Sequence, residues 1–183
     1  IPAFNEEKNI QILYKSIKDE LRRINEDYEI LFIDDNSKDR TLEKISVLAK
    51  KDKRVKAIKF SRNFGSHNAI YCGLMHAKGD GVVTIAADMQ DPPEMIHKLW
   101  GKWQKGFDVV WATRDKRLGE SIFTLFFAKI FYIVMRKIIG IKEIPENGAD
   151  FFLIDRKVID ALKNYNETTN KITFSFFVNF FCS

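Results

Sequence analysis

Apolar residues along the first 112 positions follow two alternating spacings. Runs with apolar residues every three or four positions predict helices at about residues 6–23, 39–50, 67–77 and from 92 onward. Short β-branched runs between them predict strands at 28–33, 55–60, 81–86 and 109–112. Strands separated by helices of this length are typical of βαβ units. The pattern therefore predicts an α/β domain with a mostly parallel sheet flanked by helices.

The pattern changes between residues 120 and 139. Apolar side chains there cover most of the circumference of a helix, and Lys129, Arg136 and Lys137 interrupt them. Such a segment is too charged to cross a bilayer and too apolar for a solvated surface helix. It either packs under further protein or forms an amphipathic helix in a membrane interface, with its basic residues toward the headgroups. The sequence leaves both interpretations open.

Composition narrows the range of partners. The 183 residues suffice for one α/β domain, and no linker divides them. The net charge of +5 is spread along the chain and forms no basic stripe with aromatic platforms, which argues against nucleic acid. The 16 Phe residues cluster late, and a basic, Phe-rich surface fits an anionic membrane face. Cys72 and Cys182 form no CxxC spacing, so the sequence predicts neither a zinc site nor a redox motif.

The most informative polar stretch follows the predicted strand at 81–86, where the apolar run breaks into Asp88 and Gln90 and then into two prolines. In open α/β sheets, ligands bind at this carboxyl edge. If the extended geometry persists, Asp88 and Gln90 leave the same face. Two oxygen-bearing side chains suit a hard divalent cation that shares its other positions with phosphates and water. The same residues are equally compatible with a turn and a helix start.

Further polar residues occupy comparable places. Asn5-Glu6 stands near the start, Asp34-Asp35 ends a predicted strand, and Arg114 and Arg117 follow the strand at 109–112. Parallel strands present their carboxyl ends at one edge, so we expect these groups to converge near Asp88. Carboxylates, a metal and two arginines suit a diphosphate, because the metal bridges its oxygens while the guanidinium groups hold its charge. The chain contains no P-loop and no GxGxxG phosphate cradle.

Five short motifs in order resemble those of family 2 glycosyltransferases, within them the polyprenyl-phosphate glycosyltransferases, relatives of dolichol-phosphate mannosyltransferase. The motifs are Pro2-Ala3-Phe4-Asn5-Glu6-Glu7, Asp34-Asp35-Asn36-Ser37-Lys38-Asp39, Asn63-Phe64-Gly65, Ala87-Asp88-Met89-Gln90-Asp91-Pro92-Pro93-Glu94, and Asp150-Phe151 followed by Asp155-Arg156-Lys157. The resemblance implies a GT-A fold, which is Rossmann-like. It also implies inverting transfer of one hexose from a nucleotide-diphosphate sugar, UDP-sugar favoured, to a polyprenyl phosphate.

The resemblance also implies a role for individual residues. It assigns Pro2, Phe4, Glu6, Asp34 and Asp35 to a nucleotide pocket, Asp88 and Gln90 to an Mg²⁺ or Mn²⁺ ion, Arg114 and Arg117 to the diphosphate or the lipid phosphate, and Asp150 to the acceptor as the catalytic residue. A lipid phosphate is already an anion near neutral pH, so we expect Asp150 to orient groups more than to remove a proton.

Two positions depart from the family pattern. Ala86 stands where relatives usually have the first acid of an Asp-x-Asp motif. Phe152 stands where they commonly have Arg after Asp-Phe. Each replaces a charged group, which implies a changed donor, a weaker metal site or a degenerate enzyme.

Three functions are compatible with the sequence. The first is lipid-linked sugar transfer by a single catalytic domain, residues 1–183, truncated at both ends and without its C-terminal transmembrane part. This protein would be membrane-associated, with the domain on the cytoplasmic side and homo-oligomerisation left open. The second is the same fold extending a polysaccharide or using another acceptor. The third is a non-catalytic protein that binds nucleotide sugars.

Overall fold

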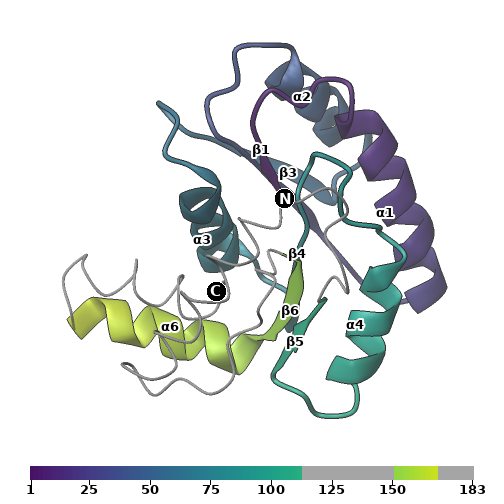
Figure 1. Cartoon of the computed structure of the whole chain (residues 1–183), viewed down its shortest axis with the longest axis vertical. Helices are drawn as coiled ribbons and strands as arrows, with labels where there is room; N and C mark the ends of the chain where they lie inside the picture. The colour runs from purple at the N-terminus through teal and green to yellow at the C-terminus, as the bar shows by residue number, and fades with distance from the viewer. Residues whose placement is uncertain (113–150, 169–183) are drawn as a thin grey trace, which may run out of the picture.

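The computed structural model describes residues 1–112 and 151–168, which form an α/β fold (Figure 1). Its elements are, in chain order, β1 (Pro2–Ala3), α1 (Ile10–Ile24), β2 (Ile30–Asp34), α2 (Thr41–Lys51), β3 (Val55–Lys59), α3 (Ser66–His76), β4 (Gly81–Thr84), α4 (Met95–Trp103), β5 (Val109–Trp111), β6 (Phe152–Asp155) and α6 (Arg156–Thr168). The helices and strands predicted over the first 112 residues are confirmed, with ends that differ by a few positions. The predicted helix at 120–139 lies outside the described residues.

The strands form two three-stranded sheets. In the first, β1, β2 and β3 run parallel in that order, and Ala3 is opposite Asp34. In the second, β6 lies between β4 and β5 and runs antiparallel to both. The parallel arrangement predicted from the βαβ pattern is therefore confirmed for β1–β3, whereas β6 adds antiparallel pairing that the pattern did not predict.

Strand β6 is buried on both faces. Its first three residues, Phe152, Leu153 and Ile154, are each at most 2% exposed. The ring of Phe152 packs against that of Trp111, with their centroids 5.0 Å apart. Where the family resemblance implies an arginine, this chain thus places an aromatic ring in the core.

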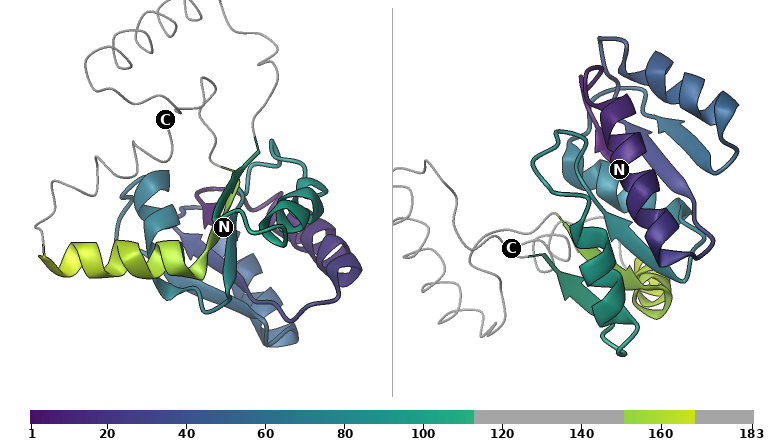
Figure 2. Two further views of the ribbon diagram at one scale, coloured as in Figure 1. Left: turned by 90° about the horizontal axis from the view of Figure 1, so that it is seen from below. Right: turned by 90° about the vertical axis from the view of Figure 1, so that its right-hand side faces the viewer.

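Helices cover both faces of the sheets. As Figures 1 and 2 show, α3 and α6 lie on one side, whereas α1 and α4 lie on the other. Helix α1 buries the apolar face that the sequence predicts, including Ile10, Leu13 and Ile17. It begins at Ile10 rather than near residue 6, because residues 6–9 form a turn closed by a hydrogen bond of 2.9 Å from Asn9 N to the Glu6 carbonyl.

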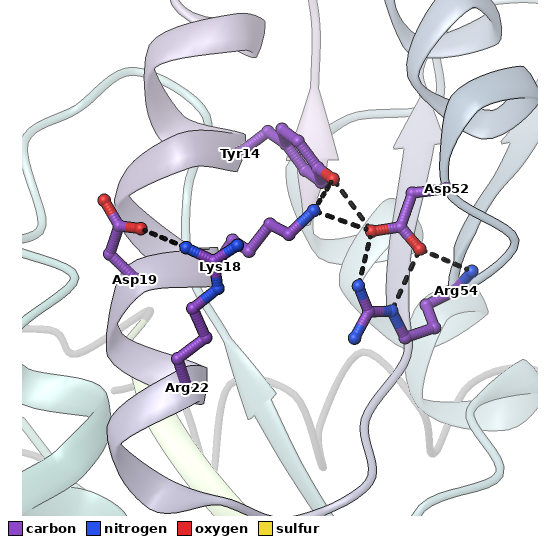
Figure 3. Close-up of polar contacts among 6 residues, drawn as sticks. All are labelled: Tyr14, Lys18, Asp19, Arg22, Asp52 and Arg54. Carbon is purple, nitrogen blue, oxygen red and sulfur yellow. Dashed lines mark hydrogen bonds and ion pairs between the residues drawn. The ribbon is translucent and has the colours of Figure 1, made fainter.

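A polar network links α1 to the residues between α2 and β3 (Figure 3). The Asp52 carboxylate accepts hydrogen bonds from the hydroxyl of Tyr14 (2.8 Å), Nζ of Lys18 (3.2 Å) and Nε of Arg54 (2.9 Å). Arg54 makes the largest contribution to holding the pKa of Asp52 well below its usual range, with Tyr14 and Lys18 adding to it. Asp52 is therefore ionised in the folded protein at neutral pH, and its charge is balanced by Lys18 and Arg54.

A cavity of about 420 Å³ lies between β2 and β4 and is walled by residues of α1, α3 and α4. Ile1 lines this cavity, and its nitrogen donates a hydrogen bond of 2.8 Å to the carbonyl of Leu31. Among the described helices, none has the length and apolar character needed to cross a membrane.

Candidate active site

The loops after β1 and β2 are held together by hydrogen bonds between their polar residues. The backbone N–H of Asn5 donates to Oγ of Ser37 (2.9 Å), and the N–H of Lys38 donates to Oδ1 of Asn5 (2.8 Å). The N–H of Glu6 donates to Oγ1 of the buried Thr41 (2.7 Å). Asn5 itself has a left-handed φ of 57°, a conformation that Asn tolerates better than most residues. The first two motifs thus build one rigid edge at the carboxyl ends of β1 and β2.

A pocket of about 240 Å³ opens at this edge. Four successive strands and the segments after them contribute its lining: Pro2 and Ala3 of β1 with Phe4 and Glu6 after it, Asp35 after β2, Asn63, Gly65, Ser66 and Ala69 after β3 and in the first turns of α3, and Ala86, Ala87 and Asp88 after β4. The predicted convergence of groups at the carboxyl ends of the strands is therefore confirmed for Glu6, Asp35 and Asp88. Phe4 stands at the pocket with 42% of its surface exposed.

The two acids at the end of β2 differ in what they contact. Asp34 is fully buried and does not belong to the pocket lining. Its Oδ1 accepts a hydrogen bond of 3.3 Å from Ser37 N, and its Oδ2 has no hydrogen-bond partner within the described ranges. Asp35 is 3% exposed, and its two oxygens accept from the N–H groups of Phe64 (2.7 Å) and Gly65 (2.8 Å). Both acids are thus buried, but only Asp35 bonds to the loop after β3.

The segment after β4 turns where the sequence pattern assumed an extended chain. Met89 has a left-handed φ of 63°, and the N–H of Gln90 donates to Oδ1 of Asp88 over 2.9 Å. The extended geometry that would place Asp88 and Gln90 on one face does not persist, because the side chain of Asp88 closes a turn of the Asx type, in agreement with the alternative interpretation of this stretch as a turn. Asp88 lines the pocket; Gln90 is exposed and, in the part of the chain that the structure describes, lies outside the lining.

Asp88 fits a divalent ion that is shared with a ligand. Within residues 1–112 and 151–168, no three acidic, histidine or cysteine side chains gather as a metal cluster. Mg²⁺ does not need such a cluster, since it usually keeps several waters and binds one or two carboxylates together with substrate phosphates. The exposed carboxylate of Asp88 at the pocket supplies a donor of this kind. The oxygens of a bound diphosphate would have to supply further ligands to the ion.

Arg114, Arg117 and Asp150 lie outside the described residues, so their predicted roles stay predictions. The strand register shows where the neighbouring segments lie. Phe152 at the start of β6 is opposite both Thr84 at the end of β4 and Trp111 at the end of β5. The chain therefore leaves β5 and enters β6 at the same sheet edge from which the Asp88 segment departs.

The loop between β3 and α3 contributes site residues that the sequence analysis assigned to no role. Asn63, Gly65 and Ser66 line the pocket, and Ala69 forms part of its base. Gly65 adopts φ 90° and ψ 158°, a region that only glycine occupies readily. The Asn63-Phe64-Gly65 sequence after a predicted strand could have indicated this loop, since Asn and Gly favour turns.

The Asp155-Arg156-Lys157 motif has a structural role. The Asp155 carboxylate accepts hydrogen bonds from the N–H of Lys157 (2.9 Å) and the indole N–H of Trp103 (2.7 Å), and these bonds lower its pKa. Arg156 donates to the carbonyls of Ala77 and Gly79, in the turn before β4. The motif thus joins β6 to α4 and to the entrance of β4.

Comparison with known proteins agrees with the motifs. Residues 1–163 match the model of Glycosyl transferase family 2. The chain is 43% identical over 169 residues to an uncharacterized glycosyltransferase of Synechocystis, covering 92% of this chain and 53% of that protein. It is 40% identical over 163 residues to the bactoprenol glucosyl transferase of Shigella phage SfV, covering 89% of this chain and 53% of the relative. The chain thus spans about half the length of these curated relatives.

A solved structure supports the fold. The structure of glucosyl-3-phosphoglycerate synthase from Mycobacterium tuberculosis, in complex with Mn²⁺ and UDP-glucose, superposes with a TM-score of 0.59 at 21% identity. The match covers 86% of this chain and 55% of that one. At this identity the likeness concerns the arrangement of helices and strands.

Proposed function

Because the chain belongs to glycosyltransferase family 2 and has the GT-A fold, we propose that it transfers a sugar from a nucleotide-diphosphate donor to a polyprenyl phosphate. The observation that carries this proposal is the pocket at the carboxyl edge of the sheets, where Phe4, Glu6 and Asp88 come together. Its support on the acceptor side is the similarity to bactoprenol glucosyl transferases at 40% identity.

The pocket suits the donor. The exposed ring of Phe4 and the half-buried side chains of Pro2 and Ala86, which all line the pocket, offer an apolar surface for a nucleoside. The Asp88 carboxylate lies at the same pocket and would hold Mg²⁺ or Mn²⁺, with Gln90 as the second predicted ligand. When bound, this ion would neutralise charge on the donor diphosphate. We propose a UDP-sugar as donor in preference to a GDP-sugar.

We propose that the reaction is a single displacement. An oxygen of the lipid phosphate attacks the anomeric carbon, the bond from that carbon to the diphosphate oxygen breaks, and its electron pair leaves with the nucleoside diphosphate. Attack from the opposite face inverts the configuration. Because the attacking phosphate is already an anion, positioning and charge stabilisation dominate over proton removal. We assign Arg114 and Arg117 to the phosphates and Asp150 to orienting the acceptor.

The acceptor places the reaction at a membrane surface. We propose that the apolar, basic segment at 120–139 rests in the interface on the cytoplasmic side, because Lys129, Arg136 and Lys137 complement anionic headgroups. Polybasic contacts of this kind contribute about 1 kcal/mol per charge near the surface.

The test is a transfer assay with the purified chain, radiolabelled UDP-glucose or GDP-mannose, undecaprenyl phosphate in detergent, and Mn²⁺ or Mg²⁺. The proposal predicts label in the lipid fraction that depends on the metal and on the lipid phosphate. Label on soluble saccharide acceptors instead would favour the polysaccharide-type alternative. Nucleotide binding by calorimetry without sugar transfer to any acceptor would overturn the proposal and favour a non-catalytic, sugar-nucleotide-binding protein.

A further inference from the structure

We infer that the cavity between β2 and β4 is a slot for one β-strand, and that the residues directly preceding Ile1 in the full-length protein fill it as an extended, apolar segment. This segment would lengthen β1 and join the two three-stranded sheets into one. The inference goes beyond the proposed function, because it concerns how the two halves of the fold are connected.

The first observation is that the slot lies between the edges of the two sheets. Strand β1 is an outer strand of the first sheet, and β4 is an outer strand of the second. Four consecutive residues at the start of β2, 28–31, and the four residues of β4, Gly81–Thr84, line the cavity. At about 3.3 Å per residue, its length suits an extended segment of about four residues.

The second observation is that the pairing of β1 with β2 reaches the first residue of β1's entrance. The carbonyl of Ile1 accepts from the N–H of Ile33 over 2.8 Å, and the nitrogen of Ile1 donates to the carbonyl of Leu31 over 2.8 Å. The N–H and C=O of one strand residue point to the same side, so the N–H of Leu31 is directed at the slot. A segment preceding Ile1 would continue the parallel ladder there, and its residue two positions before Ile1 would accept from Leu31.

The third observation is that β4 directs backbone groups at the slot from the other side. The carbonyl of Asp80 accepts from the N–H of Arg156 over 2.6 Å, on the side of β6. Backbone groups alternate in direction along a strand, so Gly81 and Val83 present theirs away from β6 and toward the slot. One inserted strand could therefore pair with β2 and β4 together.

The walls indicate the character of the segment. Helices cover the cavity on both faces, with large apolar side chains from α1 and α4 and small residues from α3; they include Ile17, Leu21 and Trp100, and Ala69, Gly73 and Ala77. A parallel strand buried on both faces is a nearly continuous apolar run. Proteins protect open sheet edges with charged residues such as lysine. Strand β3 carries the exposed Lys56 and Lys59, whereas β4 carries no charge, as fits an edge that is paired.

Filling the slot would also fix the pocket at the carboxyl edge, a consequence that rests on the proposed function. Glu6 and Asp35 follow strands of the first sheet, and Asp88 follows β4 in the second. A continuous sheet would hold these groups at a constant separation. A preorganised site binds its ligand more tightly, so donor affinity should rise when the slot is filled.

The experiment compares the 183-residue chain with two forms extended before Ile1. One extension is Thr-Val-Val-Val; the matched control is Thr-Val-Pro-Val, whose proline has no N–H for the ladder. Amide hydrogen exchange is followed by NMR at Leu31 and Val83, and stability by urea denaturation. We expect Thr-Val-Val-Val to slow exchange at both amides by about tenfold or more and to raise the urea midpoint, and Thr-Val-Pro-Val to do much less.

Two results would overturn the inference. One is equal exchange at Leu31 and Val83 in the unextended chain and the Thr-Val-Val-Val form, or equal protection by the proline control. The other is slow exchange of both amides already in the unextended chain, which would show that another segment or a second copy fills the slot.

Calorimetry with UDP and Mn²⁺ separates this inference from the proposed function. We expect the Thr-Val-Val-Val form to bind UDP about tenfold more tightly than the unextended chain. Protected amides in a protein that binds neither UDP nor GDP would contradict the proposed donor and leave the slot assignment intact. Equal UDP affinity with and without the extension, in proteins whose amides differ in protection, would overturn the link between slot and pocket.

Discussion

The guanidinium group of Arg156 donates a hydrogen bond of 2.8 Å to the backbone carbonyl of Ala77, which lies 79 positions earlier in the chain. The same side chain reaches the carbonyl of Gly79, and the N–H of Arg156 donates to the carbonyl of Asp80 over 2.6 Å. One residue at the start of α6 therefore fixes the turn from which β4 begins. The second sheet depends on this connection.

Arg156→Gln should destabilise the fold. The shorter amide cannot reach both carbonyls, so we expect the free energy of unfolding to fall by about 1–3 kcal/mol, as for the loss of hydrogen bonds to a charged group. Urea denaturation measures the change. Lys163→Gln on the same helix is the control, because Lys163 only approaches Asp160 at 3.9 Å. Equal stability of Arg156→Gln and wild type would contradict the proposed role.

The Asp52 network predicts a pH-dependent difference between wild type and Asp52→Asn. Because the pKa of Asp52 is lowered in the folded state, its ionised form contributes stability above about pH 4, and this contribution is lost as the pH falls further. We expect Asp52→Asn to be less stable than wild type at pH 7 by about 1–3 kcal/mol, and the gap to shrink in acid. Urea unfolding curves of both proteins, measured at several pH values on either side of the usual carboxyl pKa of about 4, test this.

The exposed pair formed by Arg22 and Asp19 provides a control for that experiment. Their separation is 3.5 Å, and both side chains are more than half exposed. An exposed pair contributes little to stability. Asp19→Asn should therefore change the unfolding curve little at any pH; a loss equal to that of Asp52→Asn would show that general charge balance, and not the network, sets the stability.

Asp88→Asn should greatly reduce the metal-dependent sugar transfer that we propose. The substitution keeps the shape of the side chain but removes the charge that would hold Mg²⁺ or Mn²⁺, so we expect metal-dependent transfer to fall by about a hundredfold or more. Glu94→Gln, an exposed acid outside the pocket lining, should leave transfer unchanged. Full activity of Asp88→Asn would exclude Asp88 as a metal ligand.

Ala86→Asp should strengthen the same site. Ala86 lines the pocket two positions before Asp88, where the family resemblance implies an acid. A second carboxylate raises the charge of a divalent-ion site, and ligand charge is one of the determinants of affinity. We expect tighter Mn²⁺ binding, measured by calorimetry in the presence of UDP, together with faster transfer. Unchanged Mn²⁺ affinity in a folded Ala86→Asp protein would show that position 86 does not reach the ion.

Local patterns predicted much of this fold, because β2, β3 and β4 are short β-branched runs and α1 has a clear apolar face. Strand β6 escaped prediction because the pairing of Phe152 with Thr84 and Trp111 comes from distant segments. The site residues divide in the same way, into those that local patterns predicted and those that depend on the folded geometry. Strand order brings Glu6, Asp35 and Asp88 together, as the sequence suggested. The left-handed backbone at Met89 and the bonds of Asp35 to the loop between β3 and α3 depend on geometry that residue types do not reveal.

The central place of β6 has a consequence for synthesis of the chain on the ribosome. Strands β4 and β5 are joined through β6, which is translated about 40 residues after β5 ends. The first sheet can form while the chain is still growing, but the second must wait until residue 155 has left the exit tunnel. During that interval the β4 and β5 edges are open to wrong pairing. Nascent chains stopped before Phe152 should therefore need chaperones more than chains that extend through α6.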